Sequence, residues 1–182
     1  MIGNDIVDLK LAAIQSNWRR RGWLDKIFEQ SEQDRIKKVQ DPELMVWQLW
    51  SMKEAAYKAH QRRYSLSRKY NPKDFVCTDT CVYIQDTAYQ TVSERTDNFV
   101  YTIAYSIADN TNFISKVYNQ RDNQYKTILQ HYIADIKGIH PYAVKLEKNE
   151  NGIPGIKIFD ESTDIIFSLT SHGSFSAFAI DL

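Results

Sequence analysis

The chain has 182 residues, of which 43% are hydrophobic, and its 23 Lys and Arg balance 23 Asp and Glu. A chain of this length can bury roughly 70% of the surface that its unfolded form exposes, so it needs no disulfide or structural metal to form a core. Zero net charge excludes sequence-independent binding to nucleic acid unless the charges are segregated.

The charges are in fact segregated along the sequence. Residues 1–70 hold 14 Lys and Arg against 9 Asp and Glu, a net charge of +5, and residues 71–182 hold 9 against 14, a net charge of −5. The first 70 residues therefore suit an anionic partner.

The N-terminal residues and the two cysteines indicate a cytoplasmic protein. Asp5 and Asp8 lie where a secretory signal would have basic and then uninterrupted apolar residues. The longest apolar runs are much shorter than a membrane span, so we expect no membrane partner. Cys77 and Cys81 lack a second Cys or His pair at zinc spacing, which favours two reduced cysteines.

The first part of the chain predicts a strand followed by helices. Residues 2–7 form a short apolar run typical of a strand, and residues 10–30 favour helix with a break near Gly22.

Two further helices are predicted before residue 62. The Ser-x-x-Asp pattern at 31–34 resembles a capping box that begins a short helix to about Val39. Asp41 and Pro42 then predict the start of a long helix over 43–61.

The remainder predicts two groups of strands separated by a helix over 122–137, with Gly138 as its stop. Strands following helices, twice in succession, are typical of an α+β fold. The predicted strands are 74–77, 81–85, 88–93 and 99–107, then 142–147, 155–159, 164–170 and 174–181.

The segment 3–9 places a carboxylate between apolar residues near the end of the first strand. An ionised carboxylate there needs a cation or several hydrogen-bond donors to offset its desolvation. The alternative is that Asp5 or Asp8 simply caps the helix that follows.

The segment 50–59 lies within the long helix. Glu54 and Lys58 are four residues apart, so they project from one face of the helix. An ordinary surface ion pair has the same spacing and contributes only about 0.3–0.5 kcal/mol. Three nearby alanines, however, leave room for close approach by a ligand or another backbone.

The segment 168–173 ends one strand and precedes the next. A lone histidine at such a place, here His172, is more often structural than functional. Its serine and glycine neighbours leave backbone N–H groups open to an anion.

Together these three segments resemble the 4′-phosphopantetheinyl transferase superfamily. Its members carry a Gly-x-Asp-Ile strand, a Trp-Ser-x-Lys-Glu-x-x-x-Lys helix and a Ser-His turn, which match residues 3–6, residues 50–58, and Ser171 with His172. The family's Gly-Lys-Pro turn matches residues 152–154. The first motif is similar to small holo-acyl-carrier-protein synthases, and the second to the larger surfactin-synthetase-activating type.

The resemblance implies a pseudo-dimer of two similar α/β half-domains with antiparallel sheets. Residues 1–110 resemble the second half of the larger type and residues 120–182 resemble the first, so the halves are in permuted order. One complete active site would then lie between the halves of a monomer.

The resemblance also implies the reaction, which moves the 4′-phosphopantetheine arm of coenzyme A to a serine of an acyl or peptidyl carrier protein and releases 3′,5′-ADP. Fatty acid biosynthesis is one pathway that uses such carriers. Asp5 and Glu54 would ligate Mg²⁺ or Mn²⁺. Glu54, directly or through a water on the metal, would accept the serine proton.

Four residues are expected to contact coenzyme A. Lys58, with Lys53 as a weaker candidate, would neutralise phosphate charge. Ser171 and His172 would hold the extra phosphate of the nucleotide.

Two positions depart from the family pattern. Val7 stands where the larger type has a second carboxylate, since Asp8 is one residue further along, and Ile153 stands where the turn has a lysine. The family serine is either Ser168 or Ser171. The departures motivate an alternative, a non-catalytic relative that binds coenzyme A or a carrier protein, and a plain α+β interaction domain is a third possibility.

Arg19, Arg20 and Arg21 form a candidate docking surface for a carrier protein, because carriers are typically acidic. The alternative is a solvated basic face, which charge runs usually are. More basic residues follow the long helix: Arg62, Arg63, Arg68 and Lys69.

Overall fold

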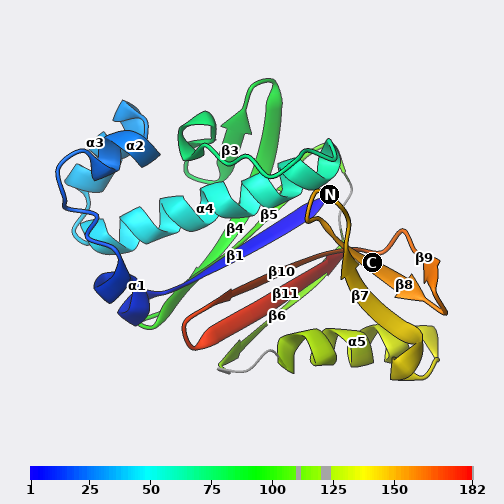
Figure 1. The fold of residues 1–182 in the computed structure, drawn as a ribbon. Helices are drawn as coiled ribbons and strands as arrows, with labels where there is room; N and C mark the ends of the chain where they lie inside the picture. Colours follow the sequence, from blue (N-terminus) through cyan, green and yellow to red (C-terminus); the bar gives the residue numbers. More distant parts are fainter. Residues whose placement is uncertain (110–111, 120–123, 182) are drawn as a thin grey trace.

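The computed structural model describes residues 1–109, 112–119 and 124–181. The first half of the chain forms a five-stranded sheet in which every neighbouring pair is antiparallel (Figure 1). The α+β fold with antiparallel sheets is thereby confirmed. In sheet order the strands are β1 (Ile2–Asp8), β5 (Phe99–Ser106), β4 (Thr87–Arg95), β3 (Cys81–Ile84) and β2 (Val76–Cys77).

The helix α4 (Pro42–Arg63) covers one face of this sheet and begins as predicted. The Asp41 carboxylate accepts a hydrogen bond from the backbone N–H of Leu44 at 2.9 Å. The strand β1 lies so close to the helix that a Cβ on Gly3 would be 2.1 Å from the carbonyl oxygen of Ala55. The small residues of α4 therefore admit a strand backbone, one of the two alternatives that the sequence left open.

Three short helices precede α4, and the helical stretch is broken near Gly22 as predicted. The predicted capping box was wrong by two residues, because the reciprocal bonds join Glu29 and Glu32. Ser31 lies inside the helix, where Asp34 accepts a bond from the side chain of Gln30. These helices are α1 (Leu9–Gln15), α2 (Trp23–Ile27) and α3 (Gln30–Lys38).

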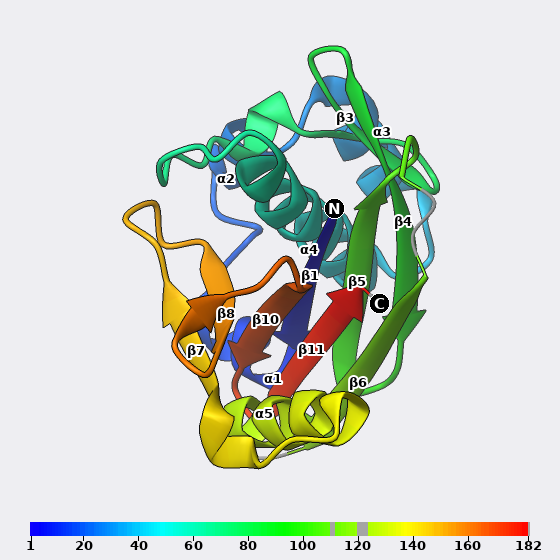
Figure 2. The same cartoon turned by 90° about the vertical axis from the view of Figure 1, so that its right-hand side faces the viewer.

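The second half of the chain packs two three-stranded sheets with one helix (Figure 2). Two of its strands, β6 (Phe113–Asn119) and β9 (Glu161–Ser162), were not predicted, and β6 precedes the expected start of this half at residue 120. The helix α5 (Gln124–Lys137) ends before Gly138 as predicted, whereas its predicted start at residue 122 lies outside the described residues. The other strands are β7 (Val144–Lys148), β8 (Pro154–Ile158), β10 (Ile166–His172) and β11 (Phe175–Asp181). Short 3₁₀ turns at Pro72–Asp74 and Pro141–Ala143 precede β2 and β7.

The two halves share one strand topology. In each half, the last strand pairs on one side with the first strand and on the other side with the strand that precedes it in sequence. The orders are β1-β5-β4 and β6-β11-β10. The molecule is layered as α4, first sheet, sheet β10-β11-β6, and α5 (Figure 1). A core cluster that includes Ile6, Ile103 and Ala179 fills the space between the two sheets.

Along β1, successive side chains point to opposite faces. Ile2 and Ile6 face the second half, whereas Gly3, Asp5 and Val7 face α4. This alternation directs Asp5 toward the helix that carries Glu54 and Lys58. None of the helices in the described part of the chain combines the length and apolar character that crossing a membrane requires.

Candidate active site

A cavity of about 420 Å³ lies where the two halves meet, and we call it the basic cavity. Asp5 of β1, Glu54 and Lys58 of α4, and Ser171 of β10 all line it. The structure therefore brings together four of the predicted site residues, which come from three separate motifs.

Side chains of β10 hold β1 in place beside the cavity. The backbone N–H groups of Asn4, Ile6 and Asp8 donate to Ser168 Oγ at 3.0 Å, Thr170 Oγ1 at 3.3 Å and His172 Nδ1 at 2.9 Å, in that order. Both serines line the cavity, but Ser168 is buried and its hydroxyl accepts from the backbone of β1, whereas Ser171 is exposed. This geometry favours Ser171 as the family serine.

The two N-terminal aspartates have different roles. Asp8 caps α1, because its Oδ1 accepts from the N–H groups of Lys10 and Leu11, and its Oδ2 accepts from the N–H of Ser174. Burial alone would raise the pKa of Asp8, but these backbone donors outweigh it and lower that pKa. Capping therefore describes Asp8, and the carboxylate that needs a cation is Asp5.

Lys58 and Thr170 partly compensate the carboxylate of Asp5. Its Oδ1 lies 3.2 Å from Lys58 Nζ and accepts a hydrogen bond from the Thr170 hydroxyl at 3.2 Å. Burial nevertheless raises the pKa of Asp5, although Lys58 and Thr170 both act to lower it. Burial, together with the nearby charge of Asp5, also raises the pKa of Glu54 to about 7, with Lys58 opposing the rise.

The buried carboxylate of Asp5 and the half-buried carboxylate of Glu54 have one lysine, Lys58, to compensate both charges, and a divalent cation would offset the remaining negative charge. Mg²⁺ prefers oxygen ligands and commonly binds through one or two carboxylates plus water and substrate phosphates. Asp5 and Glu54 fit this pattern. In the described residues no cluster of three or more Asp, Glu, His and Cys is placed to hold a metal.

Four basic side chains that the sequence did not assign to the nucleotide also line the basic cavity. Arg62 donates to the carbonyls of Pro154 and Phe167, and the other three are Arg68, Lys126 and Lys148. All three are exposed, and none forms an ion pair with a described residue. From the sequence, Ile153 indicates only that the turn lacks the lysine of the family pattern.

Arg68 reaches the 152–154 turn from the other half of the chain. A Cβ on Gly152 would lie 3.0 Å from Arg68 Nε, so the guanidinium group packs closely against this glycine, whose φ of 75° other residues rarely adopt. The end of α4 and the loop after it are joined to the turn by hydrogen bonds from Gln61 Nε2 to the Asn151 carbonyl at 3.0 Å and from Asn151 Nδ2 to the Ser65 carbonyl at 2.8 Å. The guanidinium group of Arg68 therefore lies beside the turn in which Ile153 replaces the family's lysine.

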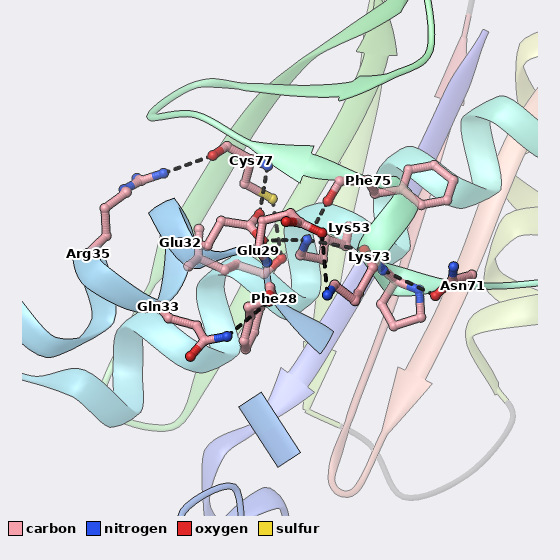
Figure 3. Close-up of polar contacts among 12 residues, drawn as sticks. Phe28, Glu29, Glu32, Gln33, Arg35, Lys53, Asn71, Lys73, Phe75 and Cys77 are labelled. Atoms are coloured by element: carbon pink, nitrogen blue, oxygen red, sulfur yellow. Dashed lines mark hydrogen bonds and ion pairs between the residues drawn. The ribbon is translucent and has the colours of Figure 1, made fainter. Parts of the chain in front are cut away.

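Lys53 does not line the cavity, so the prediction that it contacts phosphate is wrong. It is fully buried, and its Nζ lies 2.8 Å from Glu32 Oε2 and donates to the carbonyls of Pro72 and Phe75 (Figure 3). Neighbouring residues on a helix point about 100° apart, so Lys53 cannot share the face of Glu54.

The remaining predicted residues lie away from the basic cavity. His172 lines an adjoining cavity, where its Nδ1 accepts from the Asp8 N–H and its Nε2 lies 3.3 Å from Gln15 Oε1. Arg19 lies 3.3 Å from Glu43 and over the ring of Trp18. Arg20 and Arg21 are exposed in the loop before α2: their role in docking stays a prediction.

Paired carboxylates next to a lysine, with further cations around them, have the chemistry that binding of a metal ion and phosphate groups requires. The family model described as the 4′-phosphopantetheinyl transferase superfamily, ACPS, matches residues 1–106, which include Asp5, Glu54 and Lys58. The chain belongs to this superfamily, whose members are transferases that use coenzyme A as substrate.

No curated protein matches the chain. Among solved structures, it is similar to the holo-[acyl-carrier-protein] synthase of Thermotoga maritima, at 11% sequence identity and a TM-score of 0.44. That similarity covers 86% of this chain and 81% of the other.

Proposed function

We propose that this chain transfers the 4′-phosphopantetheine arm of coenzyme A to a serine of an acyl or peptidyl carrier protein, with Mg²⁺, and releases 3′,5′-ADP. The observation that carries the proposal is the meeting of Asp5, Glu54, Lys58 and Ser171 in one cavity. Residues that distant in the sequence have no structural need to converge on a cavity.

The carboxylate of Glu54 accepts the proton of the carrier serine while the serine oxygen attacks the phosphorus that bears the arm. The bond from this phosphorus to the bridging oxygen breaks, and 3′,5′-ADP leaves with the bonding electron pair. Without metal the pKa of Glu54 is about 7, and a bound divalent cation would lower it, so the carboxylate would be ionised and able to accept a proton at neutral pH. Lys58 neutralises charge on the leaving phosphate.

Asp5 and Glu54 would hold the metal ion, with Lys58 and the Thr170 hydroxyl orienting Asp5. When bound, Mg²⁺ supplies Lewis-acid stabilisation of the charge on the diphosphate. Manganese, which also prefers oxygen ligands, is an expected substitute.

Arg68, Lys126 and Lys148 hold the phosphates of the nucleotide in this proposal. Their exposed charges, which form no ion pair within the described ranges, support it, and they would take the place of the lysine that the family's turn has at position 153. His172 is tied to the backbone of β1 and contributes by fixing that strand.

Both halves of the chain line the basic cavity, which supports a monomer with its site between them. The permuted order of the half-domains rests on the order of the motifs. Residues 1–110 would form one half and the strands and helix after residue 112 the other. Sedimentation tests this directly, since a stable trimer without monomer would contradict it.

The decisive experiment is to incubate this protein with an apo carrier protein, coenzyme A and Mg²⁺, and to measure the molecular mass of the carrier. We expect a gain of one phosphopantetheine, slowed by about 10²–10⁴ in Glu54→Gln. Binding of coenzyme A with no mass gain would instead support the non-catalytic alternative. The expected acceptor is an acidic carrier in the cytoplasm.

A further inference from the structure

Arg62 lines the basic cavity at a place where both halves of the chain meet. Its Nη2 donates to the carbonyl oxygen of Pro154 at 2.9 Å and to that of Phe167 at 2.6 Å, and its guanidinium carbon lies 5.8 Å from the centre of the Phe167 ring. Arg62 belongs to α4, whereas Pro154 begins β8 and Phe167 lies on β10. One side chain of the first half therefore holds two strands of the second.

The charge of Arg62 has no negative partner. The residue is half-buried, and in the described part of the chain it forms no ion pair with a carboxylate. The two carbonyls accept hydrogen bonds but do not neutralise the charge. Burial lowers the pKa of Arg62 to about 10, which still leaves the guanidinium group ionised at neutral pH. A desolvated cation of this kind favours the binding of an anion beside it.

Three of the five N–H donors of Arg62 are unused. Nη2 has two hydrogens, and the carbonyls of Pro154 and Phe167 accept both. No described residue accepts a hydrogen bond from Nε or from Nη1 of this side chain. Phosphate oxygens form strong, charge-assisted hydrogen bonds with such donors. Arg62 can therefore hold the two strands and an anion at the same time.

One of the strands that Arg62 holds also positions Asp5. On β10, the hydroxyl oxygens of Ser168 and Thr170 accept from the backbone of β1, and Thr170 donates to the carboxylate of Asp5. Phe167, whose carbonyl oxygen accepts from Arg62, directly precedes Ser168. A group that strengthens the contact of Arg62 with β10 therefore also helps to fix the carboxylate of Asp5.

We propose that Arg62 binds a phosphate of the nucleotide and thereby couples the binding of coenzyme A to the docking of β8 and β10 on α4. The inference rests on the proposed function, in which the nucleotide occupies the basic cavity. In the empty cavity the uncompensated charge of Arg62 weakens the contact between the halves. A phosphate supplies the missing negative charge and accepts the unused N–H groups, so ligand binding strengthens that contact.

Calorimetry with 3′,5′-ADP and Mg²⁺, without a carrier, tests the contact with phosphate. Arg62→Met keeps an unbranched apolar side chain and removes the charge and all five donors. We expect it to weaken the binding of 3′,5′-ADP about tenfold to a hundredfold, as the loss of a hydrogen bond to a charged group does. Arg62→Lys keeps the charge but not the planar group, so it should recover part of the affinity.

Amide hydrogen exchange tests the coupling between the ligand and the two strands. In the unmodified protein, 3′,5′-ADP should slow exchange in residues 154–158 and 166–172 by about threefold or more. In Arg62→Met this gain should be absent, even at a concentration of 3′,5′-ADP that saturates the variant. If the role of Arg62 were purely structural, the substitution would change exchange in the ligand-free protein and leave the gain unaltered.

Arg63→Met is the matched control. Arg63 is the next residue of α4 and is also half-buried, but it does not line the basic cavity. Its Nη1 donates to Ser106 Oγ at 2.7 Å and lies 3.6 Å from Asp109 Oδ1, so its charge has a carboxylate partner. The same substitution there should change neither the affinity for 3′,5′-ADP nor the gain in protection, and a general effect on the fold would appear in both variants.

Three outcomes would overturn the inference. If Arg62→Met binds 3′,5′-ADP as tightly as the unmodified protein, Arg62 is only structural, while the proposed function stands. If inorganic phosphate slows exchange as much as 3′,5′-ADP does at the same concentration, Arg62 accepts any phosphate and its assignment to the nucleotide falls. If the unmodified protein binds neither 3′,5′-ADP nor coenzyme A, the proposed function falls and this inference falls with it.

Discussion

Two ion pairs on successive turns of α4 differ in how completely they are satisfied. Lys53 and Glu32 are both 0% exposed, and Glu32 also accepts a bond from the Cys77 N–H at 2.7 Å. Lys58 and Asp5 are 28% and 12% exposed and share their surroundings with a second carboxylate, Glu54. In the first pair all three Lys53 donors are used and Glu32 accepts three bonds, whereas the second pair has an excess of negative charge.

This difference separates a structural pair from a functional one. Removing one partner of a satisfied buried pair leaves an unpaired charge, so the effect should appear as lost stability. An under-compensated pair is instead poised to bind a cation, at some expense in stability. Four measurements test the contrast.

The largest effect is expected at Lys53. Lys53→Met should lower the free energy of unfolding by about 3–5 kcal/mol, because it leaves the Glu32 carboxylate buried without its cation. Denaturant titration measures this. The control is Lys73→Met, whose pair with Glu29 is exposed and contributes at most about 1 kcal/mol. Equal losses in the two variants would remove the distinction.

The opposite sign is expected at Glu54. In the folded protein its pKa rises from 4.5 to about 7, so the folded state holds a proton that the unfolded state loses. Stability therefore falls as pH rises from about 4.5 to 7. Without metal, Glu54→Gln should be more stable than the unmodified protein by about 1–3 kcal/mol at pH 8.

At pH 5 this gain should largely vanish, because Glu54 is then protonated in the folded state. Urea unfolding at the two pH values, in the presence of a chelator, makes the comparison. A loss of stability in Glu54→Gln at pH 8 would show that the carboxylate is satisfied after all.

Arg68 extends the contrast to the rim of the basic cavity. Because its charge is exposed, Arg68→Ala should leave the free energy of unfolding unchanged and weaken the binding of 3′,5′-ADP about tenfold. Lys69→Ala is the matched control, since Lys69 is exposed next to it and does not line the cavity. Equal affinities in both variants would take Arg68 out of the nucleotide site.

The smallest effect is expected at the candidate docking surface. Reversing the charge of Arg19, Arg20 and Arg21 should raise the KM for the carrier about fivefold and leave that for coenzyme A unchanged. Reversal of the exposed Lys37 and Lys38 is the control. An equal rise in both KM values would defeat the docking hypothesis.

Predictions from sequence succeeded where the signal is local. The start of α4 follows from Asp41 and Pro42, and the alternation in 99–107 predicts β5. The strand β6 escaped prediction because both its faces are partly buried, with Phe113 and Val117 toward the first sheet and Ile114 toward α5. Such a strand lacks the alternation of apolar and polar residues that marks one exposed face.

Residues 50–58 show the same limit within one motif. Spacing alone places Glu54 and Lys58 on one face of the helix, and the structure places both in the cavity. The spacing gives no information on which residues contact Lys53, because only the tertiary fold brings Glu32, Pro72 and Phe75 next to it.

The sequence by itself determined the helices, most strands, the motifs of the superfamily and the carboxylates of the site, since these depend on spacing over a few residues. Only the tertiary structure decided that Arg68 serves a turn some 80 residues away and that tryptophans of α2 and α4 line a cavity next to Asp5. The physical reason is that packing joins residues whose separation along the chain carries no periodic signal. A net charge of zero therefore does not describe the site, where basic side chains and a pair of carboxylates line the same cavity.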